Sequence, residues 1–463
     1  MSVTRLEPAV PVAPALNEDA ECDVARRDAM RWFALAVGSL AVAGLLAVVL
    51  VVGRVPVLAA ALIHDVDFAR RSLVVHVNLA ISVWFLSFIA GLFCLLPGAR
   101  SVRMAPVGVL LATLGMIGFT IPVFFPSAAP VLSNYIPALD HGMFLGGLAL
   151  FAAGIMLNFA DPRLLPTVTA SSIIPDDARY GLLAIVPAFL IALLTIAGAY
   201  FTQSTDMAVG AYYERLFWGG GHVLQVVNTL GMLCGWLILL RQLTGRTMIP
   251  SKIAGVLFAS MLLPILPGPW LTFGEYSGRW FTRMMEFGLF PVASVILIWG
   301  AVFLWRHRAR LTRTTLESPA FIGLATSAAM TVIGFMLGAM ITANTTLIPA
   351  HYHANIGAVT VAYVAVLLTL LPCLGVAVPW PRLAAWQPLI YGIGQMVFVL
   401  GLAVAGTLGG AARKTYGAEQ QLNLASEQVG LVIVGVGGVI AIVGGTLFIA
   451  IITCAAINSR RDR

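Results

Sequence analysis

Charge is scarce along this 463-residue chain: Asp, Glu, Lys and Arg together make up 10% of it, whereas 60% of the residues are hydrophobic. Lysine occurs only at Lys252 and Lys414. The segments between apolar runs reach only about 20 residues, which leaves no room for a soluble domain of useful size. This composition excludes an ordinary soluble enzyme and is typical of a polytopic membrane protein.

Paired cysteines are also missing. No CxxC pair and no CxxCH motif occurs, which excludes a redox pair, a zinc site of that type and a covalently attached haem. No disulfide framework is predicted either, and we interpret the cysteines as small apolar packing residues. The five are Cys22, Cys94, Cys234, Cys373 and Cys454.

Apolar runs of about 20 residues, the length that crosses a bilayer, predict an all-α bundle of twelve transmembrane helices. The count is most sensitive to the boundaries chosen around residues 253–290. The first 25 residues lack the basic segment and apolar core of a signal peptide. We therefore predict a cytoplasmic tail over 1–30, a twelve-helix domain over 31–456 and a basic cytoplasmic tail over 457–463. The predicted helices cover residues 32–52, 74–97, 106–126, 138–158, 180–202, 215–240, 253–271, 286–305, 320–343, 354–376, 387–408 and 429–454.

The basic residues predict the orientation in the membrane. With the N-terminus inside, 19 of the 27 fall on the cytoplasmic side, where membrane proteins concentrate Arg and Lys. Both termini are therefore predicted to be cytoplasmic, in a bacterial inner membrane. The net charge of +7 then reflects this bias, and no nucleic-acid partner is expected. The 19 residues are Arg5, Arg26, Arg27, Arg31, Arg100, Arg103, Arg163, Arg179, Arg241, Arg246, Lys252, Arg306, Arg308, Arg310, Arg313, Arg382, Arg460, Arg461 and Arg463.

Histidine is costly at membrane depth, so its positions mark candidate functional sites. On the predicted topology, His76, His222, His351 and His353 all lie on the outer side of the membrane. His351 and His353 are two residues apart on a helix and point about 200° away from each other. One helix can thus present an imidazole to a haem on each of its sides, and the missing CxxCH motif predicts non-covalent b-type haem.

Some other residues are also candidates for cofactor binding, and some have a purely structural interpretation. The run Gly219-Gly220-Gly221 allows close approach of either a macrocycle or a neighbouring helix. Arg413 and Lys414, in an outer loop, are positioned to bind haem propionates. His141 is a further candidate metal ligand. We interpret His307 as an interface residue and His64 as a solvated one.

The chain resembles the catalytic subunit I of the haem-copper oxidase superfamily. It is most similar to the divergent branch near cbb3-type oxidases and nitric oxide reductases. The resemblance rests on His76-Val77-Asn78-Leu79, His222, His351-Tyr352-His353 and Gly410-Ala411-Ala412-Arg413-Lys414-Thr415-Tyr416. It implies that His76 and His353 ligate a low-spin haem b, which relays electrons. It further implies that His351 is the proximal ligand of a high-spin haem b that binds O2 or NO. His222 would ligate the metal opposite that haem, while Arg413 and Lys414 would hold propionates.

One part of the family pattern is missing. The family places a His-His pair of metal ligands between helices 7 and 8, but residues 272–280 contain no histidine. Glu275 or Glu286 is then the candidate ligand, with Glu275 in the catalytic set, and a carboxylate favours non-haem iron over copper. The alternative is that both carboxylates pair with Arg279 and Arg283 at the outer surface.

The predicted function is a membrane dihaem oxidoreductase, of the terminal oxidase or nitric oxide reductase type. The inner halves of the helices show no lysine or carboxylate, so we expect no proton pumping and proton uptake from outside through Glu214, Glu275, Glu286 or the propionates. The expected electron donor is a partner subunit, a soluble cytochrome or cupredoxin, or quinol.

Two other functions remain in view. One is a non-catalytic dihaem b electron carrier or gas-binding sensor that has lost the second metal. The other is a cofactor-free transporter, which the charge-poor helix centres disfavour.

Overall fold

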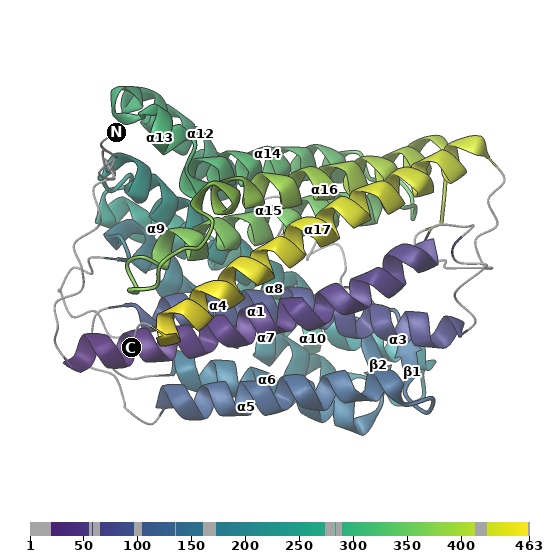
Figure 1. The fold of residues 1–463 in the computed structure, drawn as a ribbon. Coiled ribbons are helices and arrows are strands. Elements are labelled where there is room, and N and C mark those ends of the chain that lie inside the picture. Colours follow the sequence, from purple (N-terminus) through teal and green to yellow (C-terminus); the bar gives the residue numbers. More distant parts are fainter. Residues whose placement is uncertain are drawn as a thin grey trace.

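The computed structural model describes residues 20–54, 58, 65–96, 104–134, 136–160, 173–273, 283, 289–412 and 424–461. Its long helices lie side by side along a common direction (Figure 1). Among the described residues, eleven helical stretches are long and apolar enough to cross a membrane. A twelfth, α12 (Phe290–Arg306), is shorter, with 17 residues. These twelve overlap the twelve predicted helices, and the prediction of an all-α polytopic membrane protein is confirmed.

The helices have the following bounds along the chain. They are α1 (Ala20–Arg54), α3 (Val66–Val77), the π-helix η1 (Asn78–Val83), α4 (Trp84–Cys94), α5 (Met104–Thr120), the 3₁₀ turn η2 (Ile121–Phe124), α6 (Gly142–Phe159), α7 (Asp176–Thr202), α8 (Val209–Thr244), α9 (Ser251–Ser260), the 3₁₀ turn η4 (Leu263–Ile265), α10 (Gly268–Phe273), α12, the 3₁₀ turn η6 (Arg308–Arg310), α13 (Arg313–Leu316), α14 (Pro319–Ala339), α15 (Leu347–Leu370), α16 (Pro381–Leu408) and α17 (Ala425–Arg461). A two-stranded antiparallel hairpin, β1 (Ala129–Val131) and β2 (Ala138–Asp140), pairs Ala129 with Asp140 and Val131 with Ala138.

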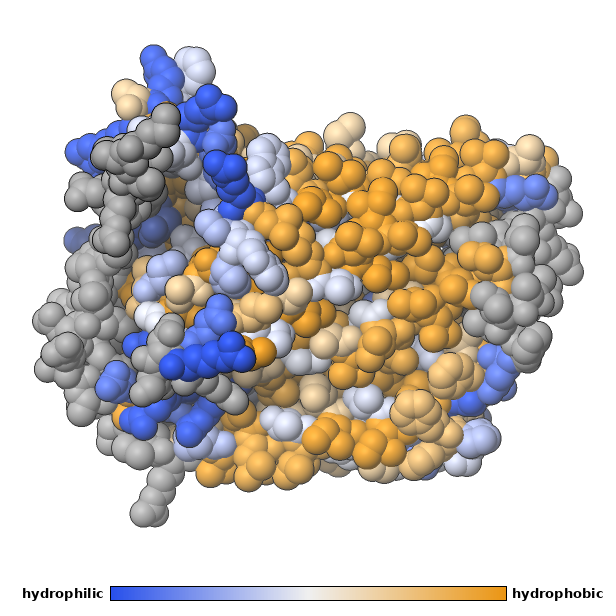
Figure 2. Space-filling view, in the orientation of Figure 1, coloured by the Kyte–Doolittle hydropathy of each residue, from blue (hydrophilic) through white to orange (hydrophobic). Residues whose placement is uncertain are grey.

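The two ends of the bundle differ in character. The start of α1 and the end of α17 lie at the same end, together with α9 and α13 (Figure 1). We call this the basic end, because it carries the arginines of residues 306–313 and gathers hydrophilic surface beside an apolar flank (Figure 2). The opposite end carries the start of α3 and the hairpin (Figure 1). The first described helix therefore begins, and the last one ends, on the same side of the bundle, as predicted.

The centre of the bundle is built around α15, which packs against α14, α16, α8 and α4. Its fully buried Tyr363 stacks on Phe88 of α4 with ring centroids 4.2 Å apart. Gly231 of α8 has no side chain where the Tyr363 hydroxyl lies, so α8 and α15 approach closely there. This close packing holds the central helices in a fixed rotation.

Several helices begin earlier than predicted. α1 begins at Ala20, so residues 20–30 of the predicted tail are helical, and α3 begins at Val66 instead of residue 74. α15 begins at Leu347 instead of residue 354, which places His351 and His353 inside the helix. Charged residues occur near the starts of α1 and α3, and in α15 the run His351-Tyr352-His353 interrupts the apolar pattern, so an apolar run does not detect these first turns. Asp65 caps one of them by accepting a hydrogen bond from the N–H of Phe68 at 2.8 Å.

Candidate functional site

His76 lies near the end of α3, where its ring contacts the first helix. Its Nδ1 is 2.9 Å from the backbone carbonyl oxygen of Ala43 on α1. The wider π-helical turns of η1 begin two residues later, at Asn78, whose side-chain amide donates to the carbonyls of Val74 (2.9 Å) and Pro137 (2.8 Å). Short π-helical stretches occur frequently at functional sites. The ring of His76 is thus fixed through Nδ1 against α1.

His351 is held by α14. Its Nδ1 lies 2.7 Å from the carbonyl oxygen of Gly334. One turn further along α14, a Cβ at Gly338 would come within 2.7 Å of the His351 ring, so the absence of a side chain there makes room for the imidazole. The amide of Asn355 donates to the carbonyl of His351 at 3.1 Å. These contacts fix both the position and the rotation of the ring.

His353 faces a different neighbour. Its ring centroid is 4.8 Å from that of Phe398 on α16 and 5.0 Å from that of Tyr352. His351, by contrast, contacts α14. The two imidazoles of α15 are therefore turned toward different helices, as their spacing of two residues requires.

His222 is buried in α8, and its Nδ1 lies 2.7 Å from the carbonyl of Trp218 one turn earlier. His307, at the basic end, makes the same contact with Phe303 at 2.9 Å. This contact is therefore a local property of a histidine on a helix and carries no information about a metal. The contacts of His76 and His351 differ, because each reaches a carbonyl of another helix.

The glycines beside His222 serve two purposes. A Cβ at Gly220 would clash with Ile196 and approach the carbonyl of Ala192 on α7, so this glycine allows two helices to pack closely. Gly221 instead lines a cavity between α8 and the segment formed by η1 and α4. The helix-packing interpretation of the glycine run is confirmed at Gly220, and the approach of a macrocycle stays a prediction.

That cavity is a small, partly open cleft, lined mostly by residues that follow His76 and His222 along their helices. Its wall is mostly apolar, with the polar groups of Ser82, Gln225 and Asn228 among its lining. Its volume of about 10 Å³ leaves room for roughly one water molecule. The full lining comprises Ile81, Ser82, Leu86, Ile136, Gly221, Leu224, Gln225 and Asn228.

The β1–β2 hairpin connects the two helices that carry His76 and His222. The hydroxyl of Tyr213 on α8 donates to Asp140 at 2.8 Å, and the backbone N–H of Asn134 donates to Glu214 at 2.8 Å. On the other side, Asn78 donates to the carbonyl of Pro137 in the hairpin. Ile136 completes the contact by lining the cavity. The hairpin therefore closes this end of the cavity and fixes α3 relative to α8.

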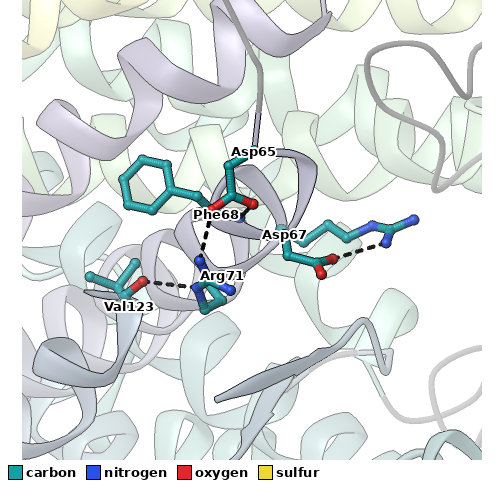
Figure 3. Close-up of polar contacts among 6 residues, drawn as sticks. Asp65, Asp67, Phe68, Arg71 and Val123 are labelled. Atoms are coloured by element: carbon teal, nitrogen blue, oxygen red, sulfur yellow. Dashed lines mark hydrogen bonds and ion pairs between the residues drawn. The ribbon is translucent and has the colours of Figure 1, made fainter. Parts of the chain in front are cut away.

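A buried arginine holds the beginning of α3 (Figure 3). The guanidinium of Arg71 donates to the carbonyl of Val123 in η2 at 3.0 Å and to the carboxylate of Asp65 at 3.2 Å. Arg71 is 5% exposed, five residues before His76. Its neighbour Arg70 pairs with Asp67 at 3.2 Å. The arginine thus ties α3 to the end of α5 and supports the position of His76.

Several predicted site residues lie outside the described part of the chain. Glu275, Glu286, Arg413, Lys414 and His64 belong to this group. The described residues nearest to Arg413 are informative: Ala412 forms a bridge with Thr345, and the N–H of Thr346 donates to Ala411 at 3.0 Å. The chain therefore leads into the Arg413-Lys414 segment beside the start of α15.

The remaining candidates have other partners. The prediction that His141 lies inside a transmembrane helix is wrong. His141 is the extended residue that caps α6, where its Nδ1 accepts the N–H of Met143 at 3.2 Å. Glu214 is bound to Asn134. Among the described residues, no three His, Cys, Asp or Glu side chains form a group that could hold a metal ion.

The basic end contains two buried carboxylates that the sequence analysis placed outside the helices. Asp28 in α1 pairs with Arg31 at 2.9 Å. Asp177 in α7 accepts hydrogen bonds from the backbone N–H groups of Met248 (3.1 Å) and Ile249 (3.0 Å). The prediction of no carboxylate in the inner halves is therefore wrong at the ends of these two helices, because both helices extend further than their apolar runs.

Sequence reasoning did not identify three residues that shape the site. Asn78, Asn355 and Gly338 position the candidate ligands without being ligands themselves. The spacing of Gly334 and Gly338, four residues apart on one predicted helix, was a detectable signal for a close approach. Nothing in the sequence indicated the π-helical turn.

The fold defines an integral membrane protein, a helical bundle with histidines on α3, α8 and α15. A family model described as cytochrome c and quinol oxidase polypeptide I matches residues 27–440. The chain belongs to this family and is a haem-copper oxidase subunit I-like protein. It is therefore a membrane protein of an oxidoreductase family that binds haem and takes part in electron transport.

The chain is also similar to two uncharacterised proteins and to a solved structure. An uncharacterised protein of Aquifex aeolicus (strain VF5) is 27% identical over 75% of this chain and 85% of its own length. An uncharacterised protein of Rickettsia prowazekii (strain Madrid E) is 24% identical over 82% of this chain and 86% of its own length. The solved structure of a haem-copper terminal oxidase dimer has a TM-score of 0.71 at 17% identity, covering 95% of this chain and 84% of that one. This last similarity supports the fold.

Proposed function

We propose that the protein is a membrane dihaem oxidoreductase that reduces O2 or NO. The observation that carries this proposal is the arrangement on α15: His351 is turned toward α14 and His353 toward α16. A helix that offers imidazoles to two sides suits a pair of haems and has no evident purpose in a carrier with one cofactor. The family to which the chain belongs supports the same chemistry.

The histidines fit the role of axial ligands. A metal-bound histidine usually donates its second ring N–H to a carbonyl or carboxylate, which fixes the tautomer. His76 and His351 each hold Nδ1 at hydrogen-bond distance from a carbonyl of another helix, so Nε2 keeps the lone pair needed for iron. We assign His76 and His353 to a low-spin haem b and His351 to a high-spin haem b.

The remaining residues have supporting roles. When bound, the haems supply electron relay and a gas-binding iron. His222 and a carboxylate, Glu275 or Glu286, would hold a second metal, for which iron suits the mixed ligands better than copper. Ser82, Gln225 and Asn228 orient water or a small molecule in the cavity beside His222. Arg413 and Lys414 would hold propionates, in a segment that begins beside the start of α15.

We further propose that protons enter from the end opposite the basic end and that the protein does not pump. Asp28 and Asp177 at the basic end are engaged by Arg31 and by backbone N–H groups, respectively. Asp28 is paired within α1 and Asp177 with the segment between α8 and α9, and neither lines the cavity. Electrons would arrive from a partner subunit, a soluble cytochrome or cupredoxin, or quinol.

The test is the cofactor content of the purified protein in detergent. Haem b is measured as the pyridine haemochrome, and iron and copper by mass spectrometry, followed by O2 and NO consumption with a reduced artificial donor. Two haems b with a further metal atom and gas reduction support the proposal. Two haems without a further metal, and without gas turnover, would instead identify a dihaem electron carrier or gas sensor. Absence of haem would refute both.

A further inference from the structure

A basic segment stands out from the side of the bundle at the basic end. It comprises residues 305–317, from the last turn of α12 through η6 and α13, and we call it the basic arm. It lies beyond the flank formed by α14 (Figure 1). Arg310 donates to the carbonyl of Thr244 at the end of α8 at 2.9 Å, and Thr312 caps α13 by accepting the N–H of Thr315 at 3.2 Å. The arm is therefore a folded element anchored to the bundle.

The arm concentrates positive charge: among the described residues, the ion pairs include one partner for its four arginines. It contains four arginines and one carboxylate, Glu317, which pairs with the exposed Arg313 at 2.9 Å. Arg306, Arg308 and Arg310 are exposed. Their planar guanidinium groups carry more donors than these contacts use, and this geometry matches phosphate oxygens. The arm is thus suited to a phosphate-bearing partner.

An apolar stripe on α12 leads directly to these arginines. Val295, Ile298, Val302 and Trp305 are spaced by three or four residues, so they share one face of the helix. Their exposed fractions are 44%, 64%, 42% and 67%. At the end of the stripe, the guanidinium of Arg308 lies over the Trp305 ring, 4.6 Å from its centroid. Tryptophan is enriched at the boundary between lipid tails and headgroups.

We propose that the basic arm and the apolar stripe of α12 together bind an anionic phospholipid of the surrounding leaflet. The stripe contacts the acyl chains, Trp305 lies at the depth of the glycerol backbone, and Arg306, Arg308 and Arg313 contact the phosphate headgroup. The combination of exposed cations above an exposed apolar helix face selects a lipid over a soluble anion, which needs no stripe. The same combination favours a lipid over nucleic acid, because nucleic acid offers no acyl chains for the apolar stripe to contact.

The test is native mass spectrometry of the full chain titrated with dioleoylphosphatidylglycerol or dioleoylphosphatidylcholine, which differ only in the headgroup. The variant R306Q/R308Q/R313Q removes three headgroup contacts and keeps Arg310, which holds the arm to Thr244. Each basic residue near an anionic lipid surface contributes roughly fivefold to affinity. We expect wild-type protein to prefer phosphatidylglycerol and the variant to bind it at least about tenfold more weakly.

A matched control is R382Q/R461Q, which removes two exposed arginines from the basic end outside the arm. It should retain the preference, and both variants should give monodisperse size-exclusion profiles and unchanged circular dichroism. Equal binding of the two lipids by wild-type protein would overturn the proposal, as would an equal loss in the control. Displacement of phosphatidylglycerol by inorganic phosphate at equal concentration, or by a short oligonucleotide, would show a general anion site instead.

Discussion

The imidazole ring of His351 occupies the space that a side chain at Gly338 would need: a Cβ there would lie 2.7 Å from both Cε1 and Nδ1 of the ring. The ring also keeps its Nδ1 on the carbonyl of Gly334, one turn away on the same helix. α14 thus acts as a template for His351, the proposed proximal ligand. This dependence makes the rotation of a candidate ligand testable through a residue that never touches a cofactor.

Gly338→Ala should disturb the high-spin haem selectively. An alanine methyl group pushes the His351 ring away from Gly334, so we expect a weaker and shifted carbon monoxide difference spectrum with an unchanged low-spin signal. The control is Gly146→Ala on α6, where a Cβ meets nothing within 4 Å. Because alanine favours helix, the control should keep its spectrum and gain about 0.5–1 kcal/mol of stability. Identical spectra for both variants would show that Gly338 does not position the ligand.

Substitution of the two histidines of α15 should separate the two haems. His353→Ala should remove the low-spin haem absorption, while His351→Ala should abolish carbon monoxide binding and leave the low-spin signal in place. His307→Ala is the control, because this histidine makes a similar helix contact at the basic end. A normal low-spin spectrum in His353→Ala would refute the assignment of that ligand.

Glu275→Gln should lower the non-haem iron content of the purified protein without changing its haem content. The amide replaces an anionic oxygen ligand by a neutral one and so weakens the binding of iron. Glu286→Gln provides the comparison, since the two carboxylates are alternative ligands. Mass spectrometry of the metal content decides between them. Iron content equal to that of the wild type in both variants would eliminate a carboxylate ligand.

Removal of the hydroxyl of Tyr213 should loosen the hairpin. Tyr213→Phe removes the hydrogen bond to Asp140, for which we expect a loss of about 1 kcal/mol in the free energy of unfolding. The comparison is Tyr212→Phe, which removes the neighbouring hydroxyl on the same turn of α8. Equilibrium unfolding in mixed SDS and detergent micelles measures both. Equal losses would indicate that the hydrogen bond to Asp140 does not stabilise the hairpin.

Hydropathy was sufficient to predict the twelve helices, whereas the grouping of His76, His222, His351 and His353 into one site stays a prediction. A bilayer imposes a strict length on apolar segments, so the number of crossings is readable from composition. The divergence of His351 and His353 followed from helix geometry alone. These predictions succeeded because each depends on a local property of the chain.

Other features depend on contacts between distant segments and were not predictable. The π-helical turn at Asn78 is stabilised by Pro137, 59 residues away. The hairpin over 129–140 contains too few residues for a strand pattern, and its β2 strand replaced the predicted start of a helix at residue 138. The early start of α3 carries charged residues, and that of α15 is separated from the following apolar run by His351-Tyr352-His353. Their backbone groups are satisfied by caps and loop contacts that the apolar pattern does not reveal.

α1 packs against α17. Of the helices that the structure describes, α1 is synthesised first and α17 last. α1 supplies the carbonyl of Ala43 that orients His76, and α17 packs against α16, whose Phe398 contacts His353. The surroundings of these two histidines are therefore complete only after α17 has been synthesised and has packed against α1 and α16. Nascent chains and chains that lack α17 should expose His353 on an unfinished wall, so cofactor loading becomes a late step of biogenesis that follows membrane insertion.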